Sequence, residues 1–361
     1  MSASTIITAL RREQAPIQGP SWLHWSTTAV VLLVAIMLPL NSAPYVNFDL
    51  TMVMVYAIGG LGLNLLTGYN GQVSLGHSAF VALGAYTAAV LIHGGWGYLA
   101  VLPISIVVCF AFGYLVGRPA LRLQGLQLAL VTLGLAIITP AAIKRLGSVT
   151  DGQEGINVFT ATAPDWSGLA DDQWIFYVTL GGLAIAWVVA KRLTAGRIGR
   201  SLVAVRDNEI VARTLGIQAA HTKTTAFAIS GAFAGAAGVF YVYAVQFVGP
   251  DSFGLTMTIA FLSLIVIGGI GTVPGAIFGA FFIQYIPTVT EQVNQSASGF
   301  TYGVALVVVM FVMPRGIVGL IRAALRPLVA RIPGRHPGGP GRSLGGSEPA
   351  MTAVLATSTV N

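Results

Sequence analysis

Charged residues are scarce in this chain of 361 residues, because only 9% are Asp, Glu, Lys or Arg while 55% are hydrophobic. A soluble domain carries about a quarter of its residues as charged side chains, which cover the surface that faces water. Most of the surface of this protein must therefore face something other than water. The composition predicts a membrane protein and excludes an ordinary soluble domain.

Cysteine and nucleotide-binding motifs are also scarce or missing. The lone cysteine, Cys109, lies in an apolar stretch, so an internal disulfide is excluded and we expect the thiol to pack as a small apolar group. No phosphate-binding loop of the form G-x-x-x-x-G-K-[ST] occurs, so the chain is not expected to bind ATP by that route. The lack of clustered acids and paired histidines argues against a membrane enzyme, and we expect no catalytic site, no metal and no cofactor.

Acidic side chains are absent from the centres of the apolar runs. Asp49, Asp251 and Glu291 lie near the ends of such runs, and Lys and Arg are likewise missing from the centres. Proton-driven carriers usually keep an ionisable group in the membrane. The nearest candidate is His77, for which a hydrogen-bonded structural role is the alternative, and sodium coupling through backbone carbonyls of broken helices stays open. If the protein pumps a solute, the sequence predicts that the motor is another polypeptide.

Long apolar runs fill most of the chain. Because a run of about 20 residues can cross a membrane as a helix, they predict an all-α polytopic membrane protein with about 8–10 transmembrane helices. Glycine and proline interrupt 72–92 and 255–290, so broken or re-entrant segments are expected there. The candidate helices lie near 27–44, 50–68, 72–92, 97–117, 124–143, 173–190, 223–247, 255–270, 275–290 and 298–313.

Basic residues gather in a few loops and predict the orientation. Lys and Arg are concentrated in 191–223 and from Arg315 onward, whereas 144–172 is acidic. We therefore expect 191–223 and both termini in the cytoplasm and 144–172 outside. The net charge of +7 follows this loop pattern, which argues for a lipid bilayer and against a nucleic-acid partner.

These features predict three parts of the chain. A cytoplasmic segment, 1–26, precedes a transmembrane domain over 27–325, which includes the outer loop 144–172 and the cytoplasmic coupling loop 191–223. The tail 326–361, rich in Pro, Gly, Ser and Thr, is expected to be disordered in the cytoplasm. The first apolar run could pass for a secretory signal, but Asn41 and Pro44 fit a cleavage site poorly, so we expect a retained helix.

A short amphipathic helix is predicted within the cytoplasmic loop, over 204–216. Helical spacing gives it an apolar face of Ala204, Val211 and Leu215 and an opposite charged face of Arg206, Glu209 and Arg213. Glu209 and Arg213 stand in the favourable i,i+4 order, and Gly216 is placed as a helix C-cap. Such a helix fits a groove on a partner protein. Lying on the membrane surface or on its own bundle is the alternative.

Two glycine-rich stretches, 59–86 and 268–275, interrupt apolar runs in the two halves of the chain. Paired interruptions of this kind indicate a central pathway for the solute. In such a place, surrounding protein or a water-filled cavity provides the hydrogen bonds that the non-helical backbone needs. The alternative is tight helix packing through small residues. The candidate pathway residues are Asn64, Tyr69, Gln72, Ser74, His77, Ser78, Thr132, Gly269 and Gly271.

Several of these runs closely resemble the permeases of branched-chain amino-acid ABC importers, the LivH/LivM type. The runs follow one another in the order of that family from about residue 50 to 320, and their combination is specific although each alone is weak. The long outer loop, with TDG at 150–152, looks more like the LivM type. The matching runs are 62–77 (GLNLLTGYNGQVSLGH), 121–126 (LRLQGL), 130–133 (LVTL), 207–209 (DNE), 215–217 (LGI), 268–275 (GGIGTVPG) and 314–319 (PRGIVG).

The resemblance implies the ABC importer permease fold, in the bacterial inner (cytoplasmic) membrane, with alternating access powered by ATP that partner subunits bind and hydrolyse. The implied partners are a second homologous permease subunit, two ATP-binding cassette subunits and a periplasmic solute-binding protein. The loop around 209–216 resembles the element that sits in a groove on the ATPase. The candidate coupling residues are Arg206, Asp207, Glu209, Ala212, Arg213, Leu215 and Gly216.

Leucine, isoleucine and valine are the default solutes that the resemblance implies. Relatives of this type also serve urea, short amides and other small carboxylates, and their selectivity rests largely with the binding protein. An ABC permease for urea, short amides or sugars is therefore the first alternative. An ion-coupled secondary carrier is the second.

Overall fold

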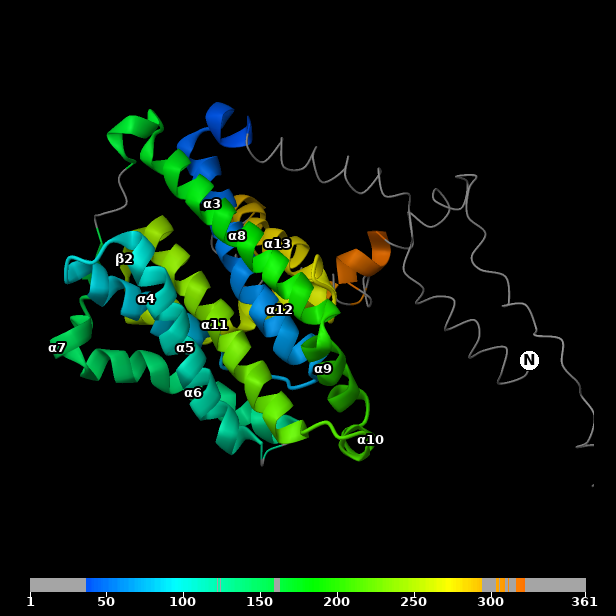
Figure 1. Ribbon diagram of the computed structural model, residues 1–361. Helices are drawn as coiled ribbons and strands as arrows, with labels where there is room; N and C mark the ends of the chain where they lie inside the picture. The colour runs from blue at the N-terminus through cyan, green and yellow to red at the C-terminus, as the bar shows by residue number, and fades with distance from the viewer. Residues whose placement is uncertain are drawn as a thin grey trace, which may run out of the picture. The chain divides into compact units, whose positions relative to one another are not determined.

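Helices dominate the computed structural model (Figure 1). It describes residues 37–121, 123, 125–158, 163–293, 303–304, 306–308, 311 and 316–321, which all belong to one compact unit, Pro20–Ala323. The predicted segments 1–26 and 326–361 lie outside the described residues, as does most of the predicted runs 27–44 and 298–313.

Within the described ranges, six helical segments are long and apolar enough to cross a membrane by length and composition. Two shorter apolar helices accompany them, so the predicted all-α polytopic architecture is confirmed. The elements in chain order are α3 (Pro44–Leu63), η1 (Asn64–Tyr69), α4 (His77–His93), α5 (Tyr98–Ala120), α6 (Leu126–Arg145), α7 (Gly147–Thr150), β1 (Ile156–Asn157), η2 (Asp165–Ser167), α8 (Asp171–Ala195), α9 (Arg197–Asp207), α10 (Glu209–Thr214), α11 (Ala219–Val245), β2 (Phe247–Val248), η3 (Pro250–Phe253), α12 (Leu255–Gly268) and α13 (Gly275–Val293).

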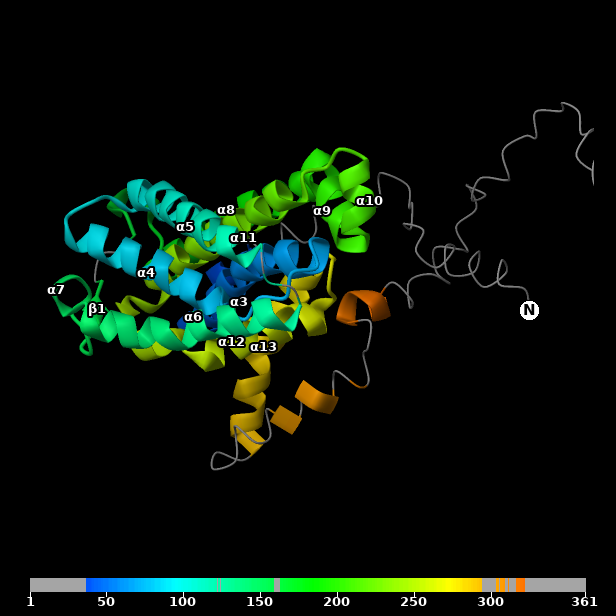
Figure 2. The same cartoon turned by 90° about the horizontal axis from the view of Figure 1, so that it is seen from below.

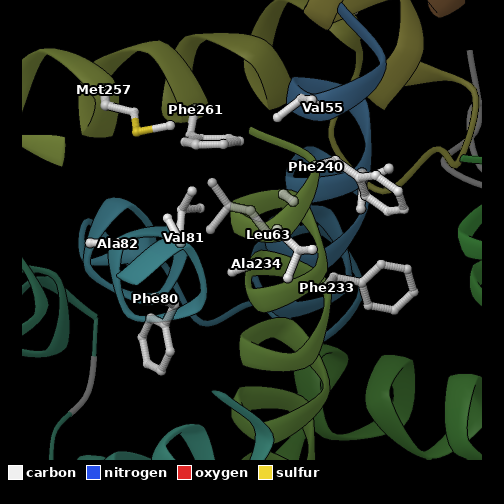
Figure 3. Close-up of a cluster of buried hydrophobic side chains, with 14 of the residues drawn as sticks. Val55, Leu63, Phe80, Val81, Ala82, Phe233, Ala234, Phe240, Met257 and Phe261 are labelled. Atoms are coloured by element: carbon white, nitrogen blue, oxygen red, sulfur yellow. The ribbon is translucent and has the colours of Figure 1, made fainter. Parts of the chain in front are cut away.

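Helix α11 packs against α3, α4 and α5 and forms the centre of the bundle. Small residues allow the close approach, since a Cβ added to Gly84 of α4 would lie 2.6 Å from the Gly235 backbone of α11. Figure 3 shows the apolar core that α3, α4 and α11 share with α12. Its labelled side chains are Val55, Leu63, Phe80, Val81, Ala82, Phe233, Ala234, Phe240, Met257 and Phe261.

The two ends of the bundle differ in structure (Figures 1 and 2). One end carries α9 and α10, which connect α8 to α11. The other end carries α7 and the antiparallel pair β1–β2, where Ile156 lies opposite Val248. At that end a 2.8 Å ion pair between Lys144 and Asp251 joins α6 to η3. In the predicted orientation, α9 and α10 face the cytoplasm and the strand pair faces outside.

The helices are interrupted at the two glycine-rich stretches. The helix α3 continues into the π-helical turn η1, residues 70–76 are not helical, and α4 begins at His77. The second interruption covers 269–274, a turn between α12 and α13. The helix expected near 72–92 therefore starts later than predicted, because its first residues form the connection that follows η1. Short π-helical turns are frequent at functional sites.

The cytoplasmic helix predicted over 204–216 is not continuous, and this prediction was wrong. Asn208 divides it, with φ −160° and ψ 106°, and its side chain accepts hydrogen bonds from the backbone N–H groups of Ile210 and Val211. Asn208 is thus the N-cap of a separate helix, α10. Ala204 consequently does not share a face with Leu215: it packs against the buried cluster of Val205, Ala212 and Ala219, whereas Leu215 is 74% exposed.

Gly216 ends α10 as predicted. Its φ of 83° is a conformation that glycine adopts readily. The Gly216 N–H donates to the Arg213 carbonyl, and the Ile217 N–H donates to the Ala212 carbonyl, both at 3.0 Å. These two bonds form the glycine-terminated cap that stops many helices.

Candidate functional site

Asn64, at the start of η1, joins the two interrupted segments. Its Nδ2 donates a 2.7 Å hydrogen bond to the Thr272 carbonyl, and its Oδ1 accepts a 2.8 Å bond from the Gly271 N–H. Asn64 is only 2% exposed, so the rest of the protein has to supply its partners. These partners are 207 and 208 positions away in the chain. Asn64 therefore fixes η1 against the turn 269–274.

The turn itself depends on its two predicted glycines. Gly269 and Gly271 have φ values of 117° and 73°, where a side chain would be strained. The Gly269 carbonyl accepts a 2.7 Å bond from the Thr272 hydroxyl. Both glycines of the pathway set thus shape the backbone that Asn64 binds.

His77 and Ser78 lie at the start of α4 and are paired inside the protein. The His77 Nε2 lies 2.8 Å from the Gly59 carbonyl oxygen, and its ring meets Phe261 edge-on with centroids 4.9 Å apart. The Ser78 hydroxyl lies 2.6 Å from that of Thr258. These contacts support the structural role for His77 that its sequence position left open.

The connection 70–76 is tied to α6 through Thr132, whose hydroxyl accepts a 2.9 Å bond from the Leu75 N–H. Within the connection, the Asn70 amide donates to the Gln72 side-chain oxygen at 2.5 Å. The Ser74 hydroxyl accepts a longer bond of 3.4 Å from the backbone N–H of Gly76. The connection is therefore an ordered part of the bundle.

Most of the predicted pathway side chains are buried in this conformation, and Tyr69 is half-buried. The side chains of Asn64, His77, Ser78 and Thr132 bond to distant parts of the chain, whereas Gln72 and Ser74 bond only within the connection 70–76. The structure brings Asn64, Gly269 and Gly271 into one cluster and places His77 with Ser78 in another. Thr132 also lines a mostly apolar groove of about 260 Å³ along α5 and α6, whose walls are Val116, Val131, Thr132, Gly134, Leu135 and Ile138. Contact between the solute and these residues stays a prediction.

Glu209 anchors α10 to α11. Its carboxylate pairs with Lys223 of α11 at 2.6 Å and with Arg213 one helical turn later. The hydrogen bond from Lys223 is the main reason that the pKa of Glu209 lies below its ordinary value. Because the pKa is lowered on folding, this stabilisation is complete at neutral pH and is lost only as the pH falls through that lowered pKa.

The outer face of α10 exposes large apolar side chains. Ile210 is 76% exposed, Leu215 74% and Val211 50%, whereas Ala212 is buried against Val205 and Ala219. An exposed apolar group of this kind often marks a contact with another protein. Of the predicted coupling set, Leu215 lies on this face and Ala212 lies beneath it. Ile210 was not among the predicted coupling residues. The sequence does carry a signal for it, because Asn208 followed by Glu209 is typical of a helix start and places Ile210 in the first turn.

Arg206 and Asp207 lie at the end of α9, and the Arg206 side chain points toward η1 and not toward the exposed face of α10. The Arg206 Nη2 lies 2.9 Å from the Asp207 carboxylate, and its Nη1 donates a 2.8 Å bond to the Gly68 carbonyl of η1. Of the predicted coupling residues, Leu215 thus lies on the exposed face of α10, Glu209 and Ala212 hold α10 to the bundle, and Arg206 contacts η1 from α9. Within the described part of the chain, no group of His, Cys, Asp or Glu is placed to hold a metal ion.

A family model described as branched-chain amino acid transport system, permease component, matches residues 46–313. The chain belongs to this permease family. The matched range of the permease includes every candidate pathway and coupling residue. The permease is by family a transport subunit, and its membrane-spanning helices agree with that assignment.

Individual relatives agree with the family. Over 300 residues the permease is 34% identical to the high-affinity branched-chain amino acid transport system permease protein LivM of Escherichia coli (strain K12), covering 76% of this chain and 70% of the relative. Identity to LivM of Salmonella typhimurium (strain LT2) is 33% over the same shares. The autoinducer 2 import system permease protein LsrC of Enterobacter sp. (strain 638) is 30% identical over 284 residues, 72% of this chain and 77% of the relative. No solved structure matches.

Proposed function

We propose that this permease is the membrane-spanning subunit of an ATP-driven importer for leucine, isoleucine and valine or related small solutes, in a bacterial inner membrane. The observation that carries the proposal is the 34% identity to LivM over 70% of that relative. Its proposed partners are a second homologous permease subunit, two ATP-binding cassette subunits that bind ATP, and a periplasmic binding protein that delivers solute. Both termini lie in the cytoplasm in this proposal.

The exposed face of α10 is the proposed contact with an ATPase subunit. Ile210, Val211 and Leu215 offer an apolar surface of one short helix, which suits insertion into a groove. ATP binding in the partners would bias the permease between two states, one open to each side of the membrane. The permease performs no chemistry itself.

A second candidate solute comes from the LsrC relatives. LsrC of Enterobacter sp. is the permease of an autoinducer 2 import system and covers a similar share of this chain. Its lower identity places it second to LivM. Urea, short amides and sugars remain the other candidate solutes.

Uptake by the reconstituted importer tests the solute class. Proteoliposomes that hold both permeases and the ATPase subunits, supplied with ATP and the binding protein, should accumulate labelled leucine. An excess of unlabelled isoleucine or valine should compete, whereas urea, ribose and autoinducer 2 should not. Vesicles without the binding protein are the control. Uptake of autoinducer 2 or urea in place of leucine would overturn the solute assignment while leaving the ATP-driven mechanism intact.

A further inference from the structure

The Gly68 carbonyl lies where three parts of the fold meet. Arg206 of α9 donates a 2.8 Å hydrogen bond to this carbonyl from its Nη1. Gly68 itself belongs to η1, and a Cβ added to it would lie 2.5 Å from the Gly271 backbone nitrogen in the turn 269–274. The cytoplasmic helix α9, the end of the first interrupted helix and the second interruption thus touch at one backbone position.

Two neighbours hold the Arg206 side chain in this place. The Asp207 Oδ1 accepts a 3.0 Å hydrogen bond from the Arg206 Nε and forms an ion pair with the Arg206 Nη2 at 2.9 Å, which leaves Nη1 directed at Gly68. The aliphatic part of Arg206 lies on Gly71, where an added Cβ would be 2.6 Å from the Arg206 Cγ. A guanidinium can bond a carboxylate and a carbonyl at once in a fixed geometry, which an ammonium group does less well.

The contact continues into the bundle through Asn64. One turn before Gly68 within η1, Asn64 binds the Gly271 N–H and the Thr272 carbonyl. The bonds therefore lead from α9 to Gly68, along η1 to Asn64, and across to the turn between α12 and α13. A displacement of α9 would pull on both interrupted segments together, since they are joined at Asn64.

We propose that Arg206 is a positioning residue that transmits the movement of α9 and α10 to the two interrupted segments through the Gly68 carbonyl. This rests on the proposed function, because it presupposes that a partner ATPase moves α10. It also assigns Arg206 a role distinct from docking, since its guanidinium contacts η1 whereas the apolar docking face lies on α10.

The test uses the complete importer with Arg206→Gln, Arg206→Lys and the matched control Arg200→Gln. Arg200 is also on α9, but its Nη1 donates to the nearby Ala195 carbonyl. Three quantities are measured for each variant: ATPase co-purification, solute uptake per ATP hydrolysed, and hydrogen exchange of the peptide that contains Gly271. The exchange rate at Gly271 would not change if Arg206 served only as a docking contact with the ATPase.

For Arg206→Gln we expect normal co-purification of the ATPase, about tenfold less uptake per ATP hydrolysed, and faster exchange at Gly271. Arg206→Lys should recover part of the uptake, because its ammonium can still donate one bond to the Gly68 carbonyl. Arg200→Gln should match the unsubstituted importer in all three quantities.

Wild-type uptake per ATP in Arg206→Gln would overturn the transmission role. So would loss of ATPase binding in both Arg206→Gln and Arg206→Lys with unchanged exchange at Gly271, because that result would make Arg206 a docking residue. Failure of the proposed function gives a different result: the unsubstituted importer would itself show no ATP-driven uptake.

Discussion

Glu209→Lys is expected to reduce ATP-driven uptake by at least about tenfold while the permease remains in the membrane. The carboxylate of Glu209 lies between Lys223 and Arg213, and its replacement would bring three cations together. Lys223 is only 14% exposed, so water screens this repulsion poorly. We therefore expect α10 to leave its position on α11, which separates the docking face from the bundle. The measurements are uptake and ATP hydrolysis by the reconstituted importer.

Two further variants separate this explanation from a general effect of charge. Lys191→Glu changes the charge by an equal amount of opposite sign at an exposed site on α8, and it should leave uptake close to wild type. The double variant Glu209→Lys with Lys223→Glu restores an ion pair of reversed polarity and should recover part of the uptake. If the reversed pair recovers nothing, the Glu209 carboxylate acts outside the permease, and its role as an anchor for α10 is wrong.

Gly216→Pro should produce the same loss of coupling by a different route. Proline fixes φ near −65° and has no N–H, whereas Gly216 has φ 83° and donates to the Arg213 carbonyl. The cap of α10 cannot form with proline at this position. Gly216→Asn serves as the matched variant, because asparagine tolerates the left-handed conformation and keeps the N–H.

Asn64→Leu is expected to destabilise the permease by about 2–6 kcal/mol and to lower uptake to background. Leucine has a similar size but offers no hydrogen bonds, so the Gly271 N–H and the Thr272 carbonyl would both lose their Asn64 partner. Each buried polar group left unpaired costs about 1–3 kcal/mol, and because both of these groups are part-buried, we expect the lower part of the range. Thermal unfolding in detergent and uptake in proteoliposomes measure the two effects.

The matched control for Asn64→Leu is Thr87→Val on α4. The Thr87 hydroxyl donates within its own helix, to the Leu83 carbonyl, so its loss separates no two parts of the fold. We expect a change in stability of less than about 1 kcal/mol. If both variants are equally mild, Asn64 does not hold the interrupted segments together.

The sequence predicts the architecture well because long apolar runs and their interruptions have local causes. Gly269 follows the end of α12, Pro274 and Gly275 mark the start of α13, and Gly68 and Gly71 mark the end of η1, at the positions where the helices are broken. The contact between the two interruptions has no local signal in the sequence. Asn64 binds the Thr272 carbonyl, which is 208 positions away, and because every residue has a backbone carbonyl, neither composition nor spacing identifies this acceptor.

The segment 197–216, which contains α9 and α10, shows why the predicted coupling helix was wrong. Helical spacing treats 204–216 as one helix, and on that basis Arg206 and Glu209 share a face. The N-cap at Asn208 instead starts a new helix axis, so Glu209 turns to Lys223 and Arg206 turns to Gly68. Asparagine before an acidic first turn is a recognisable helix start, but the direction of Arg206 depends on tertiary packing alone.

The most direct test of the account is the energy source for uptake. Proteoliposomes that contain this permease and its partner permease without ATPase subunits are given proton and sodium gradients, and the complete importer is given ATP with both gradients collapsed. We predict accumulation of leucine only by the complete importer with ATP. Accumulation by the permeases alone on either gradient would contradict the claim that movement enters through α9 and α10 from a separate ATPase.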